Sequence, residues 1–137
     1  MGDVPTSDPH VIVEFHKKLI EKLLESEEVL TALSGESGEI GIRLDEPRIA
    51  LRLRIDGENT ALEMVDSPDE PSVGPRISMK WETALRFWRG DLDIMGALLR
   101  GDIRIEGQDM EPLFRLKSVV YKAREASRQV ERELGWS

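Results

Sequence analysis

The sequence of 137 residues contains no cysteine. Disulfide bonds, thiol nucleophiles and thiolate metal sites are therefore excluded, and the composition fits a reducing compartment. Neither of the two histidines, His10 and His16, has an acidic or histidine partner at metal-ligand spacing, and we expect both on the surface. The sequence thus predicts no metal site and no cofactor.

Long apolar runs are also missing. No apolar stretch approaches the roughly 20 residues that a membrane-spanning helix needs. The segment from Met1 to Pro9 carries acids and prolines, whereas a secretory signal needs cations followed by an apolar run. The C-terminal residues 135–137 differ from the Ser-Lys-Leu peroxisomal signal. We therefore expect a cytoplasmic protein without stable membrane insertion.

Positive charge is scarce, because 19 basic residues stand against 27 acidic ones and give a net charge of -8. Such a charge repels nucleic acid phosphates and anionic membrane surfaces at long range. Nucleic acid is therefore not an expected partner. The length and the 39% of hydrophobic residues indicate one globular domain with a sizeable core.

Catalytic motifs are absent as well. The turn at 35–38 lacks the Gly-x-Ser-x-Gly spacing of a nucleophile elbow and the lysine of a phosphate-binding loop. Asp91 and Asp93 form a carboxylate pair, but they stand at a glycine-bounded helix start, where acids complement the helix dipole. We therefore expect a protein that is not an enzyme.

Hydrophobic periodicity predicts the order of helices and strands. Apolar residues recur at helical spacing between Asp8 and Gly35, which indicates a helix over about 9–34 that Ser26 could interrupt. Two short helices and a final helix over about 110–134 are predicted further along the chain. Alternating apolar and polar residues predict strands at 40–44, 48–55, 60–65, 76–81 and 102–107.

These elements predict an α+β fold with a five-stranded, mostly antiparallel sheet that helices cover on one face. We divide the chain into a disordered N-terminus at 1–8, a domain at 9–125 and a C-terminal helix extension at 126–137. In the sheet, Glu63 is expected across from one of the arginines that alternate with the apolar residues of the preceding strand.

Three glycines divide the region after residue 76 into units of fixed length. Ile77-Ser78-Met79 leads into a short helix that ends at Gly90, a second short helix ends at Gly101, and a strand ends at Gly107. This succession resembles the C-terminal half of the sterol carrier protein 2 domain, and the glycine spacing fits without gaps. The upstream strands fit the same family, so the resemblance covers about 40–120.

The resemblance implies an apolar tunnel between the helices and the sheet, which binds a hydrophobic small molecule without catalysis. Fatty acids, acyl chains, isoprenoids and sterol-like lipids are the implied ligands. Ordinary core packing is the competing explanation for every apolar side chain of this region. The predicted tunnel lining consists of Met79, Trp81, Leu85, Trp88, Met95, Leu98, Leu99, Ile103, Met110, Leu113 and Phe114.

A second function remains open, that of a dimeric or accessory interaction module for an enzyme of a lipid or quinone pathway. The helix after Tyr121 is polar and is followed by Leu134 and Trp136, which makes it a candidate contact element. Asp102 and Glu106 stand where the family commonly has basic residues. This departure argues against carrying over anionic ligands or membrane docking.

Two further features have two interpretations each. Arg86, Arg89 and Arg100 either gather at the tunnel mouth, where they would hold a carboxylate or phosphate, or lie in solvent. Gly96 inside a helix costs about 1 kcal/mol relative to alanine, which indicates close approach of another group or room for a ligand.

Overall fold

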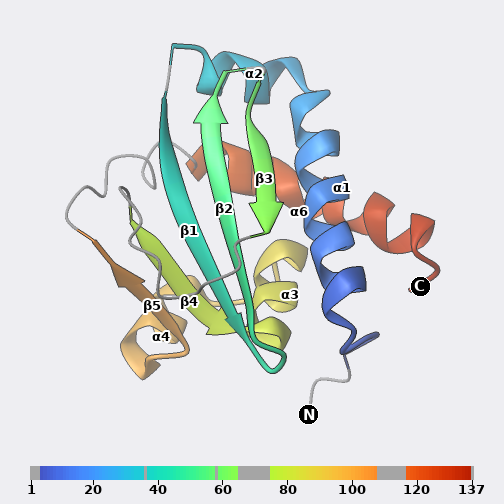
Figure 1. Ribbon diagram of the computed structural model, residues 1–137, viewed down its shortest axis with the longest axis vertical. Coiled ribbons are helices and arrows are strands. Elements are labelled where there is room, and N and C mark those ends of the chain that lie inside the picture. Colours follow the sequence, from blue (N-terminus) through green and yellow to red (C-terminus); the bar gives the residue numbers. More distant parts are fainter. Residues whose placement is uncertain (1–3, 36, 58, 65–74, 108–116, 137) are drawn as a thin grey trace.

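The computed structural model describes residues 4–35, 37–57, 59–64, 75–107 and 117–136. Two helices, four strands, two short helices, a strand and a final helix follow one another along this part of the chain, in the order that the periodicity predicts (Figure 1). Its elements are α1 (Pro9–Leu24), α2 (Glu27–Leu33), β1 (Ser37–Asp45), β2 (Ile49–Asp56), β3 (Ala61–Met64), β4 (Arg76–Lys80), α3 (Trp81–Arg89), α4 (Ile94–Arg100), β5 (Ile103–Glu106) and α6 (Lys117–Glu133).

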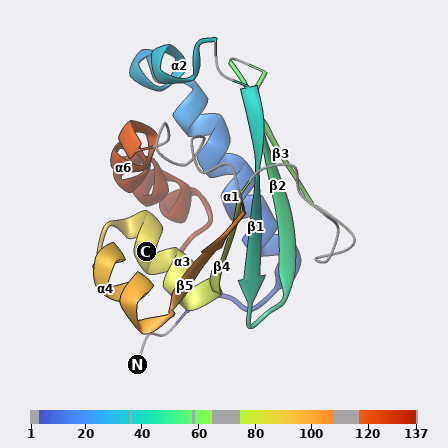
Figure 2. The same ribbon diagram turned by 90° about the vertical axis from the view of Figure 1, so that its left-hand side faces the viewer.

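The five strands form one sheet in the order β3-β2-β1-β4-β5. Neighbouring strands are antiparallel except β1 and β4, which pair in parallel. Helices α3, α4 and α6 lie together on one side of this sheet (Figure 2). The predicted α+β fold, with a mostly antiparallel five-stranded sheet and helices on one face, is confirmed.

Alternation gives the sheet one apolar and one polar face. On the helix side, Ile42, Ile77 and Ile105 stand in register across β1, β4 and β5. On the opposite side Arg52 pairs in register with Glu63, and their side-chain atoms Nη1 and Oε1 lie 3.8 Å apart. The expected position of Glu63 across from an arginine is therefore confirmed.

The first predicted helix is divided in two at Ser26. Helix α1 starts where the Asp8 carboxylate accepts a hydrogen bond of 3.0 Å from the backbone N–H of His10, with Pro9 in the first turn. Ser26 has extended backbone angles and precedes α2, whose first turn carries acids that complement the helix dipole.

The final helix, α6, begins at Lys117, and residues 108–116 lie outside the described part of the chain. Although its sequence is mostly polar, α6 buries Ala123, Ser127 and Val130 completely. These residues recur at spacings of four and three, so they form one narrow stripe facing the core. The division of the chain at residues 8 and 125 stays a prediction.

Candidate binding cavity

An apolar cavity of about 180 Å³ lies between the sheet and the helices. Four neighbouring strands supply one wall, because their inward side chains stand in register: β2 with β1, β1 with β4, and β4 with β5. The helices supply the opposite wall. The lining consists of His16, Ile40, Ile42, Leu44, Leu53, Ile77, Met79, Ala84, Phe87, Trp88, Ile94, Leu98, Ile103, Ile105 and Val120.

Two glycines set the course of the helical wall. Gly90 ends α3 with φ +77° and Gly101 ends α4 with φ +81°. This left-handed conformation is accessible to glycine at little cost and lets the last helical carbonyls accept hydrogen bonds. The predicted role of both glycines as helix ends is confirmed, and it brings α3 and α4 back across the sheet.

The cavity has an accessible end and a closed end. Ile94 of α4 and Ile105 of β5 line it while remaining 43% and 37% exposed. His16 of α1 and Leu53 of β2 line it too, and both are buried. Helix α4 and strand β5 lie on one side of the molecule and α1 on the other (Figure 1). We therefore assign the mouth of the cavity to the side of α4 and β5.

His16 joins the closed end to helix α3. Its Nδ1 lies 2.8 Å from the carbonyl oxygen of Ile12, and its Nε2 lies 3.1 Å from the indole Nε1 of Trp88. A carbonyl can only accept and an indole N–H can only donate, so the ring must carry its proton on Nδ1. His16 is therefore neutral in this arrangement, and both of its nitrogens are engaged.

Burial lowers the pKa of His16 to about 4, and the hydrogen bond with Ile12 opposes this effect only in part. Phe15 and Trp81 pack against the same ring at centroid distances of 5.3 and 5.8 Å. The expectation that His16 lies on the surface is wrong, since it is only 2% exposed, whereas His10 is exposed. Its spacing of four from Ile12 is the sequence signal that places it in the buried stripe of α1.

Four residues of the predicted tunnel lining do line the cavity, namely Met79, Trp88, Leu98 and Ile103. The other lining residues of the sheet, such as Ile77 and Ile105, follow from the same period-two alternation, but the prediction did not include them. Whether these side chains hold a ligand stays a prediction.

Trp81 and Leu85 lie in the core instead of the cavity wall. The sequence predicts Trp81 as the last residue of a strand at 76–81, where alternation turns it to the same face as Met79. The strand ends at Lys80 and Trp81 begins α3, so its side chain turns toward Phe15. Its indole N–H donates a hydrogen bond of 3.0 Å to the carbonyl of Thr6, which ties the N-terminal segment to the core.

Met95 and Leu99 point into solvent, with exposures of 66% and 82%. They stand on the outer side of α4, while Ala97 and Leu98 turn inward. The short helix has only one inward side, and the pattern of consecutive apolar residues does not identify it. The remaining predicted lining residues, Met110, Leu113 and Phe114, lie outside the described residues.

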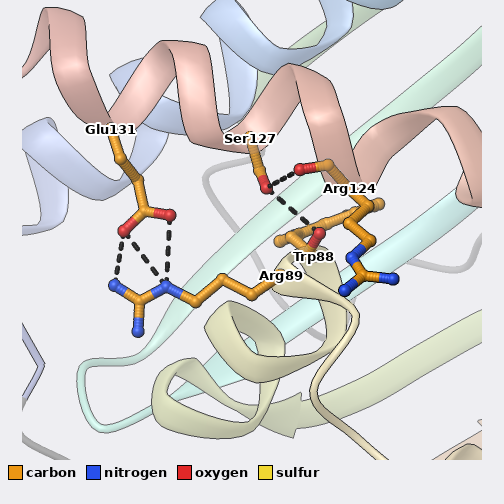
Figure 3. Close-up of polar contacts among 5 residues, drawn as sticks. All are labelled: Trp88, Arg89, Arg124, Ser127 and Glu131. Carbon is orange, nitrogen blue, oxygen red and sulfur yellow. Dashed lines mark hydrogen bonds and ion pairs between the residues drawn. The ribbon is translucent and has the colours of Figure 1, made fainter.

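Ion pairs and hydrogen bonds hold the end of α3 against α6 (Figure 3). The guanidinium of Arg89 donates to both carboxylate oxygens of the buried Glu131, with Nε 3.1 Å from each. The hydroxyl of Ser127 lies 3.1 Å from the carbonyl oxygen of Trp88 and shares its proton with the carbonyl of Arg124. These contacts fix the backbone of Trp88, and with it one wall of the cavity.

Two of the three candidate head-group arginines are paired with carboxylates, and the third, Arg86, is exposed. Arg89 pairs with Glu131, and Arg100 pairs with Asp102, whose Oδ2 lies 3.0 Å from its Nε. A Cβ added to Gly96 would lie 2.6 Å from Oδ2 of Asp93, so this glycine accommodates a neighbouring side chain of its own segment.

Among the described residues, no cluster of three or more His, Asp or Glu side chains is arranged to hold a metal ion. In the same part of the chain, no helix is both long and apolar enough to span a membrane.

Solved structures share this fold. Sterol carrier protein 2 aligns with a TM-score of 0.64 at 17% identity, covering 92% of this chain and 98% of its own. A conserved protein of Thermus thermophilus whose name suggests a sterol carrier aligns with a TM-score of 0.64 at 20% identity, over 94% and 95%. The ubiquinone synthesis protein UbiJ-SCP2 gives a TM-score of 0.62 at 15% identity, over 84% and 96%.

No protein-family profile matches the sequence, and no curated protein does. The structural likeness extends over nearly the whole chain of each of these relatives. The chain therefore has the sterol carrier protein 2 fold.

Proposed function

We propose that this protein is a non-catalytic carrier of a hydrophobic small molecule and a member of the sterol carrier protein 2 family. The observation that carries the proposal is the apolar cavity, which reaches the surface beside Ile94 and Ile105 in the same fold as the sterol carriers. Fatty acids, acyl chains, isoprenoids and sterol-like lipids are the candidate ligands.

Burial of hydrocarbon supplies the binding energy. Transfer of a methylene group from water into an apolar site contributes about 0.8 kcal/mol, so binding strengthens with every methylene that enters the cavity and needs no polar contacts. An apolar cavity of about 150 Å³ in another protein binds benzene, and the cavity here is of similar size, about 180 Å³. It suits a slender chain, and a rigid sterol nucleus would require α4 to move away from the sheet.

Catalysis is not part of the proposal. In the described lining, His16 is the one side chain that could act as an acid or base, and its nitrogens are engaged by Ile12 and Trp88. A general base needs a free lone pair within reach of the substrate. We place the protein in the cytoplasm, in accordance with its composition.

The test is to identify what the purified protein contains and what it binds. Native mass spectrometry after expression should detect a bound lipid, and a fluorescent fatty acid should gain intensity on titration with the delipidated protein. A protein that is free of lipid and also leaves the probe unchanged would contradict the carrier function.

An accessory role in a lipid or quinone pathway is the second candidate. Met95 and Leu99 expose apolar surface on α4 next to the mouth, and one structural relative is a ubiquinone synthesis protein. Exposed apolar clusters are typical of interaction surfaces. Sedimentation of the wild type and of Leu99→Asp distinguishes the candidates, because a dimer that the substitution dissociates, without any lipid binding, favours the accessory role.

A further inference from the structure

Among the described residues, the two polar side chains that line the cavity are hydrogen-bonded to each other. The indole N–H of Trp88 donates to Nε2 of His16 over 3.1 Å, and the remaining nitrogen of His16 is engaged with the carbonyl of Ile12. Every other side chain of the described lining is a hydrocarbon or, at Met79, a thioether. The described lining therefore offers a ligand no strong hydrogen-bonding side chain.

This arrangement has a consequence for which end of a ligand can enter. A hydroxyl or carbonyl that leaves water for an apolar site costs free energy unless it finds a hydrogen-bond partner. In the described lining, the indole N–H of Trp88 and Nε2 of His16 could bond to such a group, but each is already bonded to the other. A terminal methyl group has no such requirement.

We infer that the His16–Trp88 pair is a specificity determinant that admits the unsubstituted end of a hydrocarbon chain and rejects a chain end carrying a hydroxyl or other polar group. The inference rests on the proposed lipid-carrier function and names the ligand end that enters. The polar head of the ligand then stays outside, at the mouth formed by α4 and β5.

Position in the fold supports this orientation. The pair stands at the closed end of the cavity, where His16 is buried, and the exposed lining residues Ile94 and Ile105 are at the other end. Trp88 is itself held by α6, because Ser127 donates to its carbonyl and the next residue, Arg89, pairs with Glu131. These contacts hold the backbone of Trp88, and the hydrogen bond to His16 orients its indole.

The experiment compares dodecanoic acid with its ω-hydroxy counterpart by isothermal titration calorimetry on the full chain. The wild type should bind dodecanoic acid more tightly by about 5- to 150-fold, which is the ratio expected when a hydroxyl is buried without a partner. Equal affinities for the two acids would overturn the inference.

Each of two variants removes one member of the pair and leaves the other free to form a hydrogen bond with the ligand. Trp88→Phe keeps an apolar ring and frees Nε2 of His16 as an acceptor, whereas His16→Leu frees the indole N–H as a donor. Either change gives the hydroxyl a partner, so the preference for dodecanoic acid should fall by about 2- to 12-fold. Trp88→Phe with an unchanged preference contradicts the inference even if His16→Leu fails to fold.

Ile103→Val is the matched control, since it removes one methylene from the lining and leaves the pair intact. It should weaken both acids alike and keep their ratio. If the wild type binds neither acid, the carrier function fails. If it binds both but the ratio does not respond to the pair, the carrier function stands and the specificity role is wrong.

Discussion

Arg89 at the end of α3 forms a two-pronged ion pair with Glu131 of α6, and the carboxylate is almost fully buried while the guanidinium is about one-third exposed. The hydrogen bond with Glu131 stabilises the charged form of the guanidinium and so raises the pKa of Arg89. Because Glu131 stands on the helix that also holds the Trp88 carbonyl, this pair connects the cavity wall to the C-terminal helix.

Removing Arg89 should therefore destabilise the fold. Arg89→Ala leaves a buried carboxylate without its partner, a change that costs about 3–5 kcal/mol in a fully buried pair and under about 1 kcal/mol in an exposed one. For this partly exposed pair we expect a loss of about 2 kcal/mol, measured by urea unfolding. Glu133→Gln is the control, since it removes an exposed carboxylate of α6 that pairs with Lys22 of α1. If both variants lose the same free energy of unfolding, burial of the Glu131 carboxylate does not set the cost.

Gly90 should tolerate a side chain less well than Gly101. Both have positive φ, so alanine costs about 1 kcal/mol or more of backbone strain at either position. At Gly90 a Cβ would also lie 2.9 Å from Cδ of Arg124, while nothing lies within 4 Å of one at Gly101. Thermal unfolding should show Gly90→Ala to be the more destabilising by about 1 kcal/mol. Adding Arg124→Ala should remove this excess, and an excess that persists would place its cause elsewhere.

The sheet and its apolar face follow from the sequence because strand alternation is local. Met79 and Ile103 could be placed on the helix side from their spacing alone, and register across the strands then brings them together. The parallel pairing of β1 with β4 could not be predicted in the same way. It depends on how a distant segment returns to the sheet, which no local pattern encodes.

The polar pair at the closed end of the cavity is the clearest feature that sequence reasoning missed. His16 and Trp88 are 72 positions apart, and each appears ordinary within its own helix. A histidine with no nearby acid is usually a surface residue, and the hydrogen bonds with Ile12 and with Trp88 on α3 make its burial favourable. Leu98 and Leu99 illustrate a second limit, because a helix of seven residues is too short for its period to identify the inward side.

Acid should destabilise the fold through His16. Its pKa is about 4 in the folded protein and about 6.5 in the unfolded chain, so below pH 6.5 the unfolded chain takes up a proton that the folded one refuses. Above pH 6.5 the free energy of unfolding has its full value with respect to this group. As the pH falls below 6.5 the free energy of unfolding decreases, by about 2 kcal/mol at pH 5. Urea unfolding at several pH values measures it.

His16→Leu should remove this component of the pH dependence, whereas His10→Gln, at an exposed position, should preserve it. Indole fluorescence gives an independent signal, because protonation of Nε2 breaks the bond from Trp88. If the wild type and His16→Leu lose stability in parallel between pH 7 and pH 5, His16 does not carry the effect.

Adjacent leucines on α4 provide the sharpest test of where the ligand lies. Leu98 lines the cavity, and Leu99 is 82% exposed. Leu98→Arg places a long cation at an apolar wall, where it either fills the cavity or displaces α4, so binding of a fluorescent fatty acid should weaken at least about tenfold. Leu99→Arg makes the same chemical change one residue away in solvent, and the affinity should stay within about twofold. Because the two variants share charge and composition, a difference between them reports position alone. Equal loss in both would place the binding surface on the outside of α4, and unchanged binding in both would move the ligand away from this cavity.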